Sequence, residues 1–565
     1  MEIFEGNAVG KRIWDEVWKL PIMQPGKQGT SPTTFGDAAL VIKGNILQVY
    51  GGEPSVDGAP IAEGAVDGLL EGSLFLGLQS YFKEFGSVYK LLFGPKSFIV
   101  ISDPAIAKFI LKDNAKAYDK GVLAEILEPI MGQGLIPADP ETWKVRRRAI
   151  VPGFHKAWYN AMCNTFVQCN QPLLNKLNNA VKSGEVLNME TEFCSVALDI
   201  IGKAVFNYDF GSVTQESPVI QSVYSALKEA EHRSLTPLPY WNLPFANILV
   251  PRLRKFNADL KLLDNVLAEL IGQTLSTQNK ADVEELEKRN YDEMENPSLL
   301  RFLVDMRGED TTSKQLRDDL MTMLIAGHET TAAVLTWAIF ELSQKPELVV
   351  KVQAELDEVL GDRDPTFDDI PNLQMIRLII AESLRMYPEP PLLIRRALED
   401  HTLPAGSAGF ETKVSRGTDI FLALYNIHRD PEYWENPDEF DPERFLRPFS
   451  NPNKPQWAGY TPVTSTLYPN EVHTDYAYLP FGAGSRKCIG DQFACMEAAV
   501  TLALVLKRFE FQLAIPPEDV GIYTGATIHT RNGLMMHVKE RQSETGGISN
   551  SQVDSASAQP DSVAA

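Results

Sequence analysis

The chain has 565 residues, of which 44% are hydrophobic and 23% are charged, and this balance excludes a disordered or fibrous protein. Its 53 Lys and Arg residues against 75 Asp and Glu residues give a formal net charge of −22, which disfavours a nucleic-acid-binding protein. The five cysteines form no C-x-x-C pair. A disulfide scaffold, a structural zinc site and a self-contained iron–sulfur cluster are therefore disfavoured.

The two ends of the chain differ in composition from its middle. Residues 1–75 are rich in glycine and short of periodicity, which predicts an N-terminal extension ahead of one catalytic domain at 76–540. Small polar residues predict a disordered tail at 541–565. The first residues are already acidic, so neither a signal peptide nor a plastid transit signature is predicted. The sequence contains no uninterrupted apolar run of about 18 residues, so no membrane-spanning helix is predicted.

Regular structure is predicted to begin with a hairpin. Residues 87–102 alternate around a Gly-Pro turn and are rich in β-branched side chains, which is typical of two paired strands. A helix should follow directly, with Asp103 as its N-cap and Pro104 at its first position.

Helical patterns then dominate residues 150–350. They are interrupted by a proline-rich apolar segment, Leu235–Pro251, and by a charged segment at 281–297. Strands and helices do not alternate in the predicted pattern, so β–α–β units are not expected. The expected fold class is therefore mainly α with small β-sheets (α+β).

The strongest chemical signal is the segment FGAGSRKCIG at 481–490, which presents Cys488 just before a predicted helix. A thiolate near a helix N-terminus is stabilised by the helix dipole and by free N–H groups. We expect Gly482 and Gly484 to let the backbone approach a flat ligand, with Arg486 as a nearby cation. A haem iron with a thiolate ligand needs such a loop. The other cysteines lack this context and are interpreted as buried small hydrophobic residues.

A second signal combines ESLR, which contains Glu382 and Arg385, with PERF, which contains Arg444. The i,i+3 spacing places the first two on one helix face. Because buried charges must be paired, we expect the three side chains to form a buried ion network that holds the cysteine loop.

A third signal is AGHETT at 326–331, inside a long helical pattern. Glycine and paired threonines are unfavourable in mid-helix, and threonine can bend a helix by bonding to a carbonyl. The motif predicts a locally widened helix over a cofactor, with Gly327 removing bulk beside whatever the helix covers and Glu329 and Thr330 arranged to deliver protons. The alternative is a polar patch that faces solvent. A zinc protease is excluded, because no second histidine has the required spacing.

A fourth signal is WKVRR, in which Trp143 and Arg147 lie one helical turn apart and could both bind a carboxylate. The alternative is a solvated helix face. The neighbouring Lys144, Arg146 and Arg148 make a local basic patch on an acidic protein.

With these motifs in this order, the chain resembles the cytochrome P-450 family of haem-thiolate monooxygenases from about residue 80 to 539. The resemblance implies the cytochrome P-450 fold, with haem b between a long bent helix and the cysteine-loop helix. It implies Cys488 as the axial iron ligand with Phe481 against its sulfur, and Glu329 and Thr330 as proton donors in dioxygen activation. The residues that would hold the haem propionates are Trp143, Arg147, Arg395 (with Arg396 as the adjacent alternative) and Arg486.

Three segments, at 117–155, 467–482 and 524–534, are similar to the plastid carotenoid-hydroxylase clan of this family, and most of all to its β-ring branch in plants and algae. This similarity implies hydroxylation of β-carotene-type rings in the chloroplast, with electrons from ferredoxin and its reductase. Residues 451–470 are expected to be an insert outside the core fold.

The sequence contains no flavin or nicotinamide motif, so electrons should come from a separate partner. Lys487 with Lys144, Arg146 and Arg148 would form a basic footprint for an acidic carrier. The substrate should be apolar. Leu235–Pro251 could either dip into a membrane surface or form a packed lid.

Three rival interpretations remain. The enzyme could act on another lipid or terpenoid. It could be a haem-thiolate hydroperoxide lyase or isomerase, although such enzymes do not need the proton-delivering Thr330. It could also be a non-catalytic haem protein, which would need none of the AGHETT arrangement.

Overall fold

The computed structural model describes residues 59–60, 62, 73–93, 96–215, 217–235, 241, 245–276, 298–307, 313–463 and 466–541. Most of the expected extension at 1–75, nearly all of the tail at 541–565 and the charged segment at 281–297 lie outside these residues. Within them, regular structure begins at Leu74, two residues before the expected boundary at 76.

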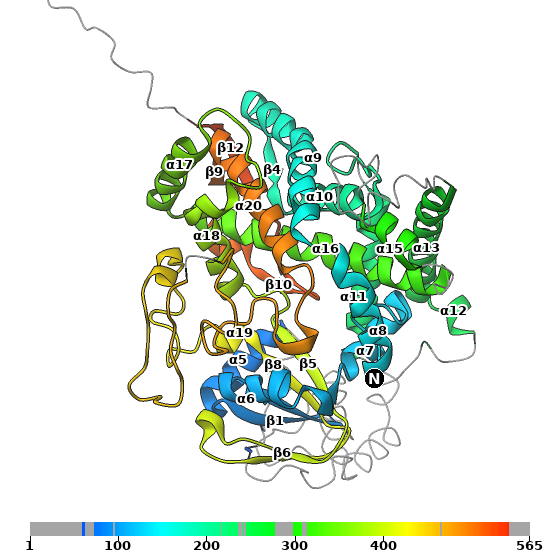
Figure 1. The fold of residues 1–565 in the computed structure, drawn as a ribbon, viewed down its shortest axis with the longest axis vertical. Helices are drawn as coiled ribbons and strands as arrows, with labels where there is room; N and C mark the ends of the chain where they lie inside the picture. The colour runs from blue at the N-terminus through cyan, green and yellow to red at the C-terminus, as the bar shows by residue number, and fades with distance from the viewer. Residues whose placement is uncertain are drawn as a thin grey trace, which may run out of the picture.

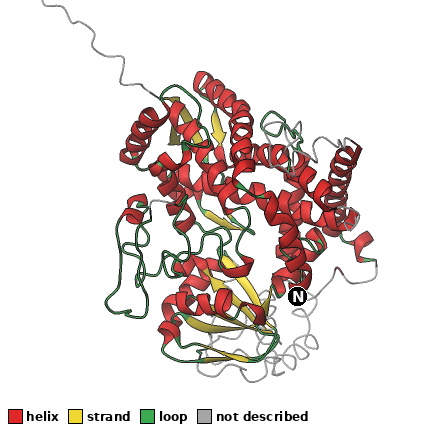
Figure 2. Ribbon diagram, in the orientation of Figure 1, coloured by secondary structure: helices red, strands yellow, loops and turns green. Residues whose placement is uncertain are grey.

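The expectation of a mainly α protein with small sheets is confirmed (Figure 2). Helices fill most of the molecule, and the largest sheet lies at one end of it (Figure 1). The helices of eight or more residues are α5 (Leu74–Phe85), α7 (Val122–Met131), α8 (Pro140–Ile150), α9 (Lys156–Ser183), α10 (Met189–Ile201), α11 (Pro218–Leu235), α13 (Pro251–Ser276), α15 (Leu299–Arg307), α16 (Ser313–Leu342), α17 (Pro346–Leu360), α18 (Gln374–Met386) and α20 (Asp491–Arg508). The four-residue and five-residue helices are α6 (Pro104–Lys108), α12 (Ala246–Leu249), α19 (Leu424–Ile427) and α21 (Pro517–Val520).

The strands form four sheets in the described part of the chain. The largest has the order β1-β2-β8-β5-β3, and only its β2–β8 pair is parallel. Its strands are β1 (Val88–Phe93), β2 (Lys96–Ile101), β8 (Asp419–Ala423), β5 (Leu392–Ala397) and β3 (Tyr118–Asp119). The smaller sheets contain β4 (Val186–Asn188), β12 (Met535–Glu540) and β9 (Phe509–Leu513) in that order, then β6 (His401–Leu403) with β7 (Thr412–Val414), and β10 (Ile522–Thr524) with β11 (Ile528–Thr530).

The predicted hairpin and the helix after it are confirmed. Strands β1 and β2 pair antiparallel, with Val88 opposite Ile101 and Phe93 opposite Lys96. The Asp103 carboxylate accepts a hydrogen bond from the Ile106 N–H at 2.8 Å and so caps α6, which begins at Pro104. Each feature depends on residues close together in the chain, and this is why the sequence predicts it.

The AGHETT motif lies in α16, which remains one continuous α-helix through the motif, so the expected local widening is not seen. Gly327 removes bulk beside its neighbour, as expected, and that neighbour is another helix. A Cβ there would lie 2.4 Å from Cδ1 of Ile201, so the glycine lets α16 pack closely on α10. The stretch Lys314–Leu342 is long and apolar enough to cross a membrane, but 78% of its most apolar window is buried inside the protein. We therefore interpret it as the central core helix.

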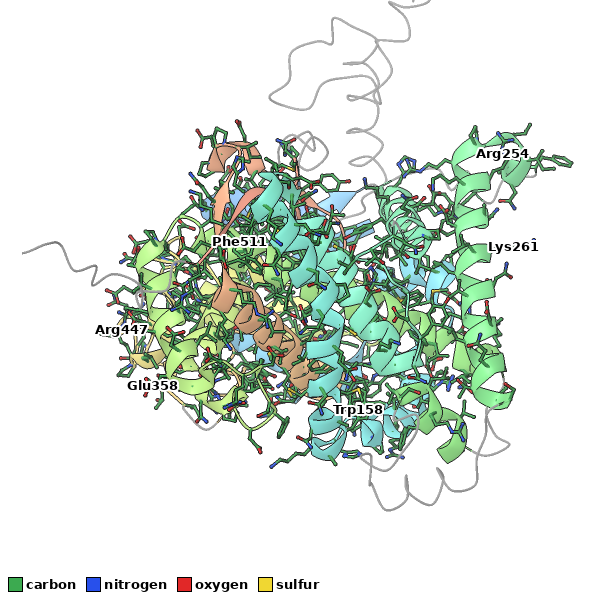
Figure 3. The ribbon with its side chains drawn as sticks, turned by 90° about the horizontal axis from the view of Figure 1, so that it is seen from above. Trp158, Arg254, Lys261, Glu358, Arg447 and Phe511 are labelled. Carbon is green, nitrogen blue, oxygen red and sulfur yellow. The ribbon has the colours of Figure 1, made fainter. Side chains whose placement is uncertain are left out.

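The cysteine-loop helix α20 starts at Asp491, as predicted, and packs on α9. The ring of Trp158 stacks on Phe493 of α20 at 5.4 Å between centroids, and Phe166 meets Phe493 edge-on at 5.0 Å. Figure 3 shows Trp158 on α9, beside this helix. These aromatic contacts fix the helix that follows Cys488.

The segment 451–470 is not the separate insert that we expected. Tyr460 is buried and donates a hydrogen bond from its hydroxyl to the Phe445 carbonyl at 2.6 Å. Tyr468 is also buried, and its ring lies 4.9 Å from that of Phe481 in the cysteine loop. The segment therefore packs against the core and covers part of the loop, because its apolar tyrosine rings need burial.

The expected ion network of Glu382, Arg385 and Arg444 is confirmed. Glu382 and Arg385 are fully buried and form two hydrogen bonds of 2.8 and 2.9 Å. Arg444 donates its Nε–H to Glu382 Oε1 at 2.9 Å. The other guanidinium N–H groups donate to backbone carbonyls of residues 428–439.

The network reaches the cysteine loop through the backbone around it. Arg385 donates to the carbonyl of His428, whose Nε2 accepts the N–H of Leu479 at 2.8 Å. The hydroxyl of Tyr478 donates to the carbonyl of Ala381 at 2.7 Å. The chain that leads into the loop is therefore held by α18 and by the segment that the two arginines bind.

Replacing Arg385 with Leu should lower the free energy of unfolding by about 3–5 kcal/mol, because Glu382 would keep a buried charge with half of its partners removed. Urea unfolding followed by circular dichroism measures this change. The matched control is Arg508→Leu, which breaks an exposed ion pair to Asp364 of 3.1 Å and should cost less than about 1 kcal/mol. Equal effects of the two substitutions would contradict the assigned role of the network.

Candidate functional site

Cys488 lies at the centre of the candidate site. Its N–H donates to the Phe481 carbonyl at 3.0 Å, and its Sγ accepts the Gly490 N–H at 3.3 Å. Burial and Asp491 raise the pKa of the thiol to about 11, against the lowering effect of the Gly490 N–H and of Arg147. The side chain nevertheless has an accessible face. A thiol that is desolvated by surrounding protein and still accessible borders an internal space.

The glycines shape the loop. Gly482 and Gly484 both have positive φ, 68° and 67°, which explains why glycine is needed there. A Cβ at Gly484 would lie 1.8 Å from the carbonyl oxygen of Leu111. Gly484 therefore lets the loop pack against the backbone of residues 109–113.

Four cations and a tryptophan converge near the thiol. The guanidinium of Arg486 lies 4.2 Å from the centre of the Trp143 ring, and that of Arg147 lies 5.9 Å from it. Arg395 lies in β5, and its charge and that of Arg486 both lower the pKa of Lys120, after the larger effect of burial. The structure therefore brings together the four residues that the sequence predicts for this role and adds Lys120.

Burial is the largest influence on two guanidinium groups of this cluster and lowers the pKa of Arg395 and of Arg486 to about 10. The charge of Arg486 lowers the pKa of Arg395 further, and that of Arg147 lowers the pKa of Arg486, against the raising effect of Asp119 on both. The buried Nη2 of Arg486 has no hydrogen-bond partner. Such a cluster fits a ligand that carries carboxylates, such as the propionates of a haem beside Cys488.

The geometry distinguishes Arg395 from its neighbour. Arg396 binds the carboxylate of Asp419 at 2.8 and 2.9 Å and that of Glu125 at 2.5 Å. Arg395 instead donates only to the carbonyl of Ile394 among the hydrogen bonds found for it, at 2.8 Å. Because successive residues of a strand point to opposite faces, only Arg395 faces the cationic cluster.

Arg147 also has a second contact that the sequence did not predict. Its Nη1 donates to the carbonyl of Lys487 at 2.6 Å, directly before Cys488. The residue therefore holds the cysteine loop as well as belonging to the cationic cluster. Phe481 lies at the other end of the loop, packed against the ring of Tyr468.

The central helix presents two different faces at its motif. Met323, Ala326 and Thr330 retain accessible surface, whereas His328 and Glu329 are buried. The i, i+3, i+7 spacing places the first three on one stripe of an otherwise buried helix, so this stripe lines an internal space. The hydroxyl of Thr330 donates to the Ala326 carbonyl at 2.8 Å. The alternative of a solvent-facing patch is excluded by the burial of His328 and Glu329.

Glu329 is oriented by groups from the end of the chain. Its Oε1 lies 3.0 Å from Nε2 of His529 and accepts the hydroxyl of Thr527 at 3.2 Å. Glu329 and Thr330 are thus adjacent in the motif and have separate contacts.

The expected basic footprint is smaller than the sequence suggests. Arg146 is buried and pairs with Asp319 at 3.3 Å, and Lys487 pairs with Glu471 at 3.0 Å and with Asp491 at 3.6 Å. Lys144 and Arg148 are exposed. A helix places successive residues about 100° apart, so Lys144 and Arg148 share one face of α8 and Arg146 lies on the opposite face.

A cavity of about 600 Å³ reaches Cys488 beside this footprint. Arg147 and Lys156 lie on its wall together with apolar side chains of Phe154, Phe367 and Leu467. The cavity gives an approach to the cysteine loop from the side of α8 and α9.

Several residues of the site could not be identified from the sequence. Lys120 precedes a glycine turn and stands in no motif, so only its three-dimensional proximity to Arg395 and Arg486 identifies it. His529 lies about 200 residues from Glu329 in sequence. The chain segment TGATIHTRNGL contains it and carried a family similarity, but no spacing rule links it to AGHETT.

Comparisons with known proteins agree with this site. The family model Cytochrome P450 matches residues 66–533. The chain is 52% identical over 527 residues to "Cytochrome P450 97B2, chloroplastic" of Glycine max, covering 91% of this chain and 90% of that one. It is 44% identical over 524 residues to "Protein LUTEIN DEFICIENT 5, chloroplastic" of Arabidopsis thaliana, covering 91% and 83%. It is 42% identical over 494 residues to "Carotene epsilon-monooxygenase, chloroplastic" of the same plant, covering 87% of each.

Proposed function

Because the chain belongs to the cytochrome P450 family, we propose that it hydroxylates rings of carotenoids of the β-carotene type with dioxygen in the chloroplast. The class of enzyme, a haem-thiolate monooxygenase, agrees with the family match and with a relative that is named as a monooxygenase. Relatives named for lutein and carotene support the substrate class, and three chloroplastic relatives support the compartment.

The observation that carries the proposal is the accessible thiol of Cys488 beside a cluster of cations in which the buried Nη2 of Arg486 has no hydrogen-bond partner. In the proposed enzyme, Cys488 binds the iron of haem b, and Phe481 packs near the sulfur. Thiolate-ligated haem iron supplies the dioxygen activation that insertion of oxygen into an unactivated C–H bond requires. The propionates are held by Trp143, Arg147, Arg395 and Arg486, with Lys120.

The overall reaction consumes one C–H bond, one dioxygen, two electrons and two protons, and yields one C–OH group and one water. Thr330 and Glu329 bring the protons, because one lies on the accessible stripe of α16 and the other is fixed directly beside it in the helix. The protein also orients the substrate and keeps water out. Half-buried apolar side chains of α7, including Leu123 and Ile126, suit an apolar polyene.

Expression in a bacterial host that accumulates β-carotene, together with a ferredoxin and its reductase, tests this function. Hydroxylated carotenes should appear in the pigments by mass spectrometry and vanish in Cys488→Ser. A haem-bearing enzyme that leaves carotenes unchanged would contradict the substrate. Conversion of a fatty hydroperoxide without any reductant would instead favour the lyase or isomerase alternative.

An acidic electron carrier of the ferredoxin type is the proposed redox partner. Its docking surface would combine Lys144 and Arg148, which are exposed on α8, with Lys156 on the wall of the cavity beside Cys488. Opposite charges steer such encounters, and this effect weakens as salt is added. The cavity leads to the loop carbonyl that Arg147 binds, which shortens the path to the thiolate.

Lys144→Glu plus Arg148→Glu should slow stopped-flow reduction by ferredoxin by about tenfold or more at low salt, because charge steering changes association rates by 10–10³. Haem content should be unchanged. The matched control reverses the same two charge types at Arg254 and Lys261, on the outer side of α13 at the edge of the molecule (Figure 3). Equal slowing in both double variants, or none in the first, would exclude this docking surface.

A peripheral membrane contact is the proposed role of Leu235–Pro251, whose residues 236–240 and 242–244 lie outside the described part of the chain. Phe245, Ile248 and Leu249 are 72%, 67% and 73% exposed at and beside α12. Three neighbouring apolar side chains that remain exposed suit a lipid surface better than a packed lid. A carotene dissolved in that surface would lie close to the enzyme.

A further inference from the structure

Three ionisable side chains from distant parts of the sequence meet beside the central helix. His529 of β11 lies between Glu329 of α16 and Glu190 in the first turn of α10. Its Nε2 lies 3.0 Å from Glu329 Oε1, and its Nδ1 lies 2.9 Å from Glu190 Oε1. Nε2 also lies 2.8 Å from the hydroxyl oxygen of Thr527. Each ring nitrogen therefore has a carboxylate within hydrogen-bond distance, and an imidazolium with two N–H donors satisfies both.

Threonines fix the two carboxylates. The hydroxyl of Thr527 donates to Glu329 Oε1 at 3.2 Å. The hydroxyl of Thr530 donates to Glu190 Oε2, and its backbone N–H donates to Glu190 Oε1 at 3.3 Å. The β10–β11 hairpin therefore holds all three members of the cluster in place.

Burial shifts the pKa of each other titratable group around the ring toward its neutral form. The Tyr224 ring meets the His529 ring edge-on at 5.5 Å, and its hydroxyl lies 2.8 Å from Sγ of Cys194. Burial raises the pKa of Tyr224, Cys194 and Glu389, and Glu389 accepts the Ile528 N–H at 2.8 Å. Burial lowers the pKa of His328.

Glu190 and Glu329 are the described groups whose hydrogen bonds and charges raise the pKa of His529. Burial alone would lower the pKa of His529, but the hydrogen bonds and charges of the two carboxylates outweigh it and raise the pKa to about 10. At neutral pH the ring is therefore protonated.

Accessibility falls along the cluster toward the motif. The side chains of Glu190 and His529 are 14% and 13% exposed, whereas that of Glu329 is 4% exposed. Solvent therefore reaches the outer two members and not Glu329. A proton that Glu329 gives up must be replaced through a neighbour, and His529 is the neighbour that holds one.

We propose that His529, held by Glu190, returns protons from solvent to Glu329 during each turnover. This inference rests on the proposed function, in which Glu329 delivers protons. The His529 imidazolium transfers its Nε2 proton to the ionised Oε1 of Glu329, which passes that proton on. The neutral ring keeps its Nδ1 proton toward Glu190 and regains one proton at Nε2 from water, so one proton enters for each that leaves. His529 and Glu190 are therefore positioning residues that act through Glu329.

His529→Gln keeps a hydrogen-bonding side chain but removes the proton carrier. With dioxygen, ferredoxin and its reductase, carotene hydroxylation should fall about tenfold or more, since proton delivery is worth about 10²–10⁴. Consumption of reductant should continue with release of hydrogen peroxide. With iodosylbenzene, which donates one oxygen atom and needs neither electrons nor protons, the variant should match the wild type. The control His537→Gln alters an exposed histidine of β12 and should behave as the wild type in both assays.

Glu190→Gln supplies a readout that does not depend on activity. Histidine-labelled holoenzyme in its diamagnetic, reduced carbon-monoxide form should show the His529 ring protonated until about pH 10 by nitrogen NMR. Glu190→Gln removes a raising influence, so the ring should lose its proton at lower pH. The loss of hydroxylation with rising pH, measured with dioxygen, should shift in the same direction.

The outcomes separate this inference from the proposed function. Normal dioxygen-driven hydroxylation in His529→Gln, or equal losses with dioxygen and iodosylbenzene, would overturn the relay. An unshifted pH profile in Glu190→Gln would also overturn it. If the wild type fails to hydroxylate carotene even with iodosylbenzene, the proposed substrate is wrong, and the NMR titration then decides whether Glu190 sets the protonation of His529.

Discussion

The burial of charge around Glu382 is the constraint on which the site depends. One carboxylate lies between the guanidinium groups of Arg385 and Arg444, and all three side chains are nearly inaccessible to solvent. Since a buried charge without its partner costs several kcal/mol, the surrounding backbone has little freedom to rearrange. The chain that leads into the cysteine loop is linked to this ion network by hydrogen bonds to His428 and Ala381. The position of Cys488 follows from these contacts.

The site has a positively charged region near Cys488 and a separate cluster of ionisable side chains around Glu329. Near Cys488, excess positive charge is held by burial and by aromatic contact with Trp143, and this favours a ligand with carboxylates. Beyond the central helix, Glu190 and Glu329 hold one imidazolium between them. The first arrangement suits binding of a dianionic cofactor, and the second suits movement of protons. The continuous α16 lies between these functions and presents Thr330 to the interior.

The sequence predicted features that depend on residues close together in the chain, and contacts whose two partners both lie in motifs. The Asp103 cap, the hairpin, the start of α20 and the Glu382 network are of this kind. It failed where tertiary packing decides. The expected widening of α16 at AGHETT is absent, and Arg146, which the sequence placed in an exposed basic patch, turns inward to Asp319. Lys120 and His529 have no motif partner in sequence, because their roles arise only when distant segments of the chain fold together.

The central claim is that Cys488, positioned by its loop, binds haem iron as a thiolate. The most direct measurement is the reduced carbon-monoxide difference spectrum of the purified chain, of Cys488→Ser and of Gly484→Ala. The account predicts a thiolate-type Soret band in the wild type and none in Cys488→Ser. Gly484→Ala should lose most of the band, because its Cβ would overlap the Leu111 carbonyl. A thiolate-type band that persists in Cys488→Ser, or a wild type that binds haem without such a band, would contradict it.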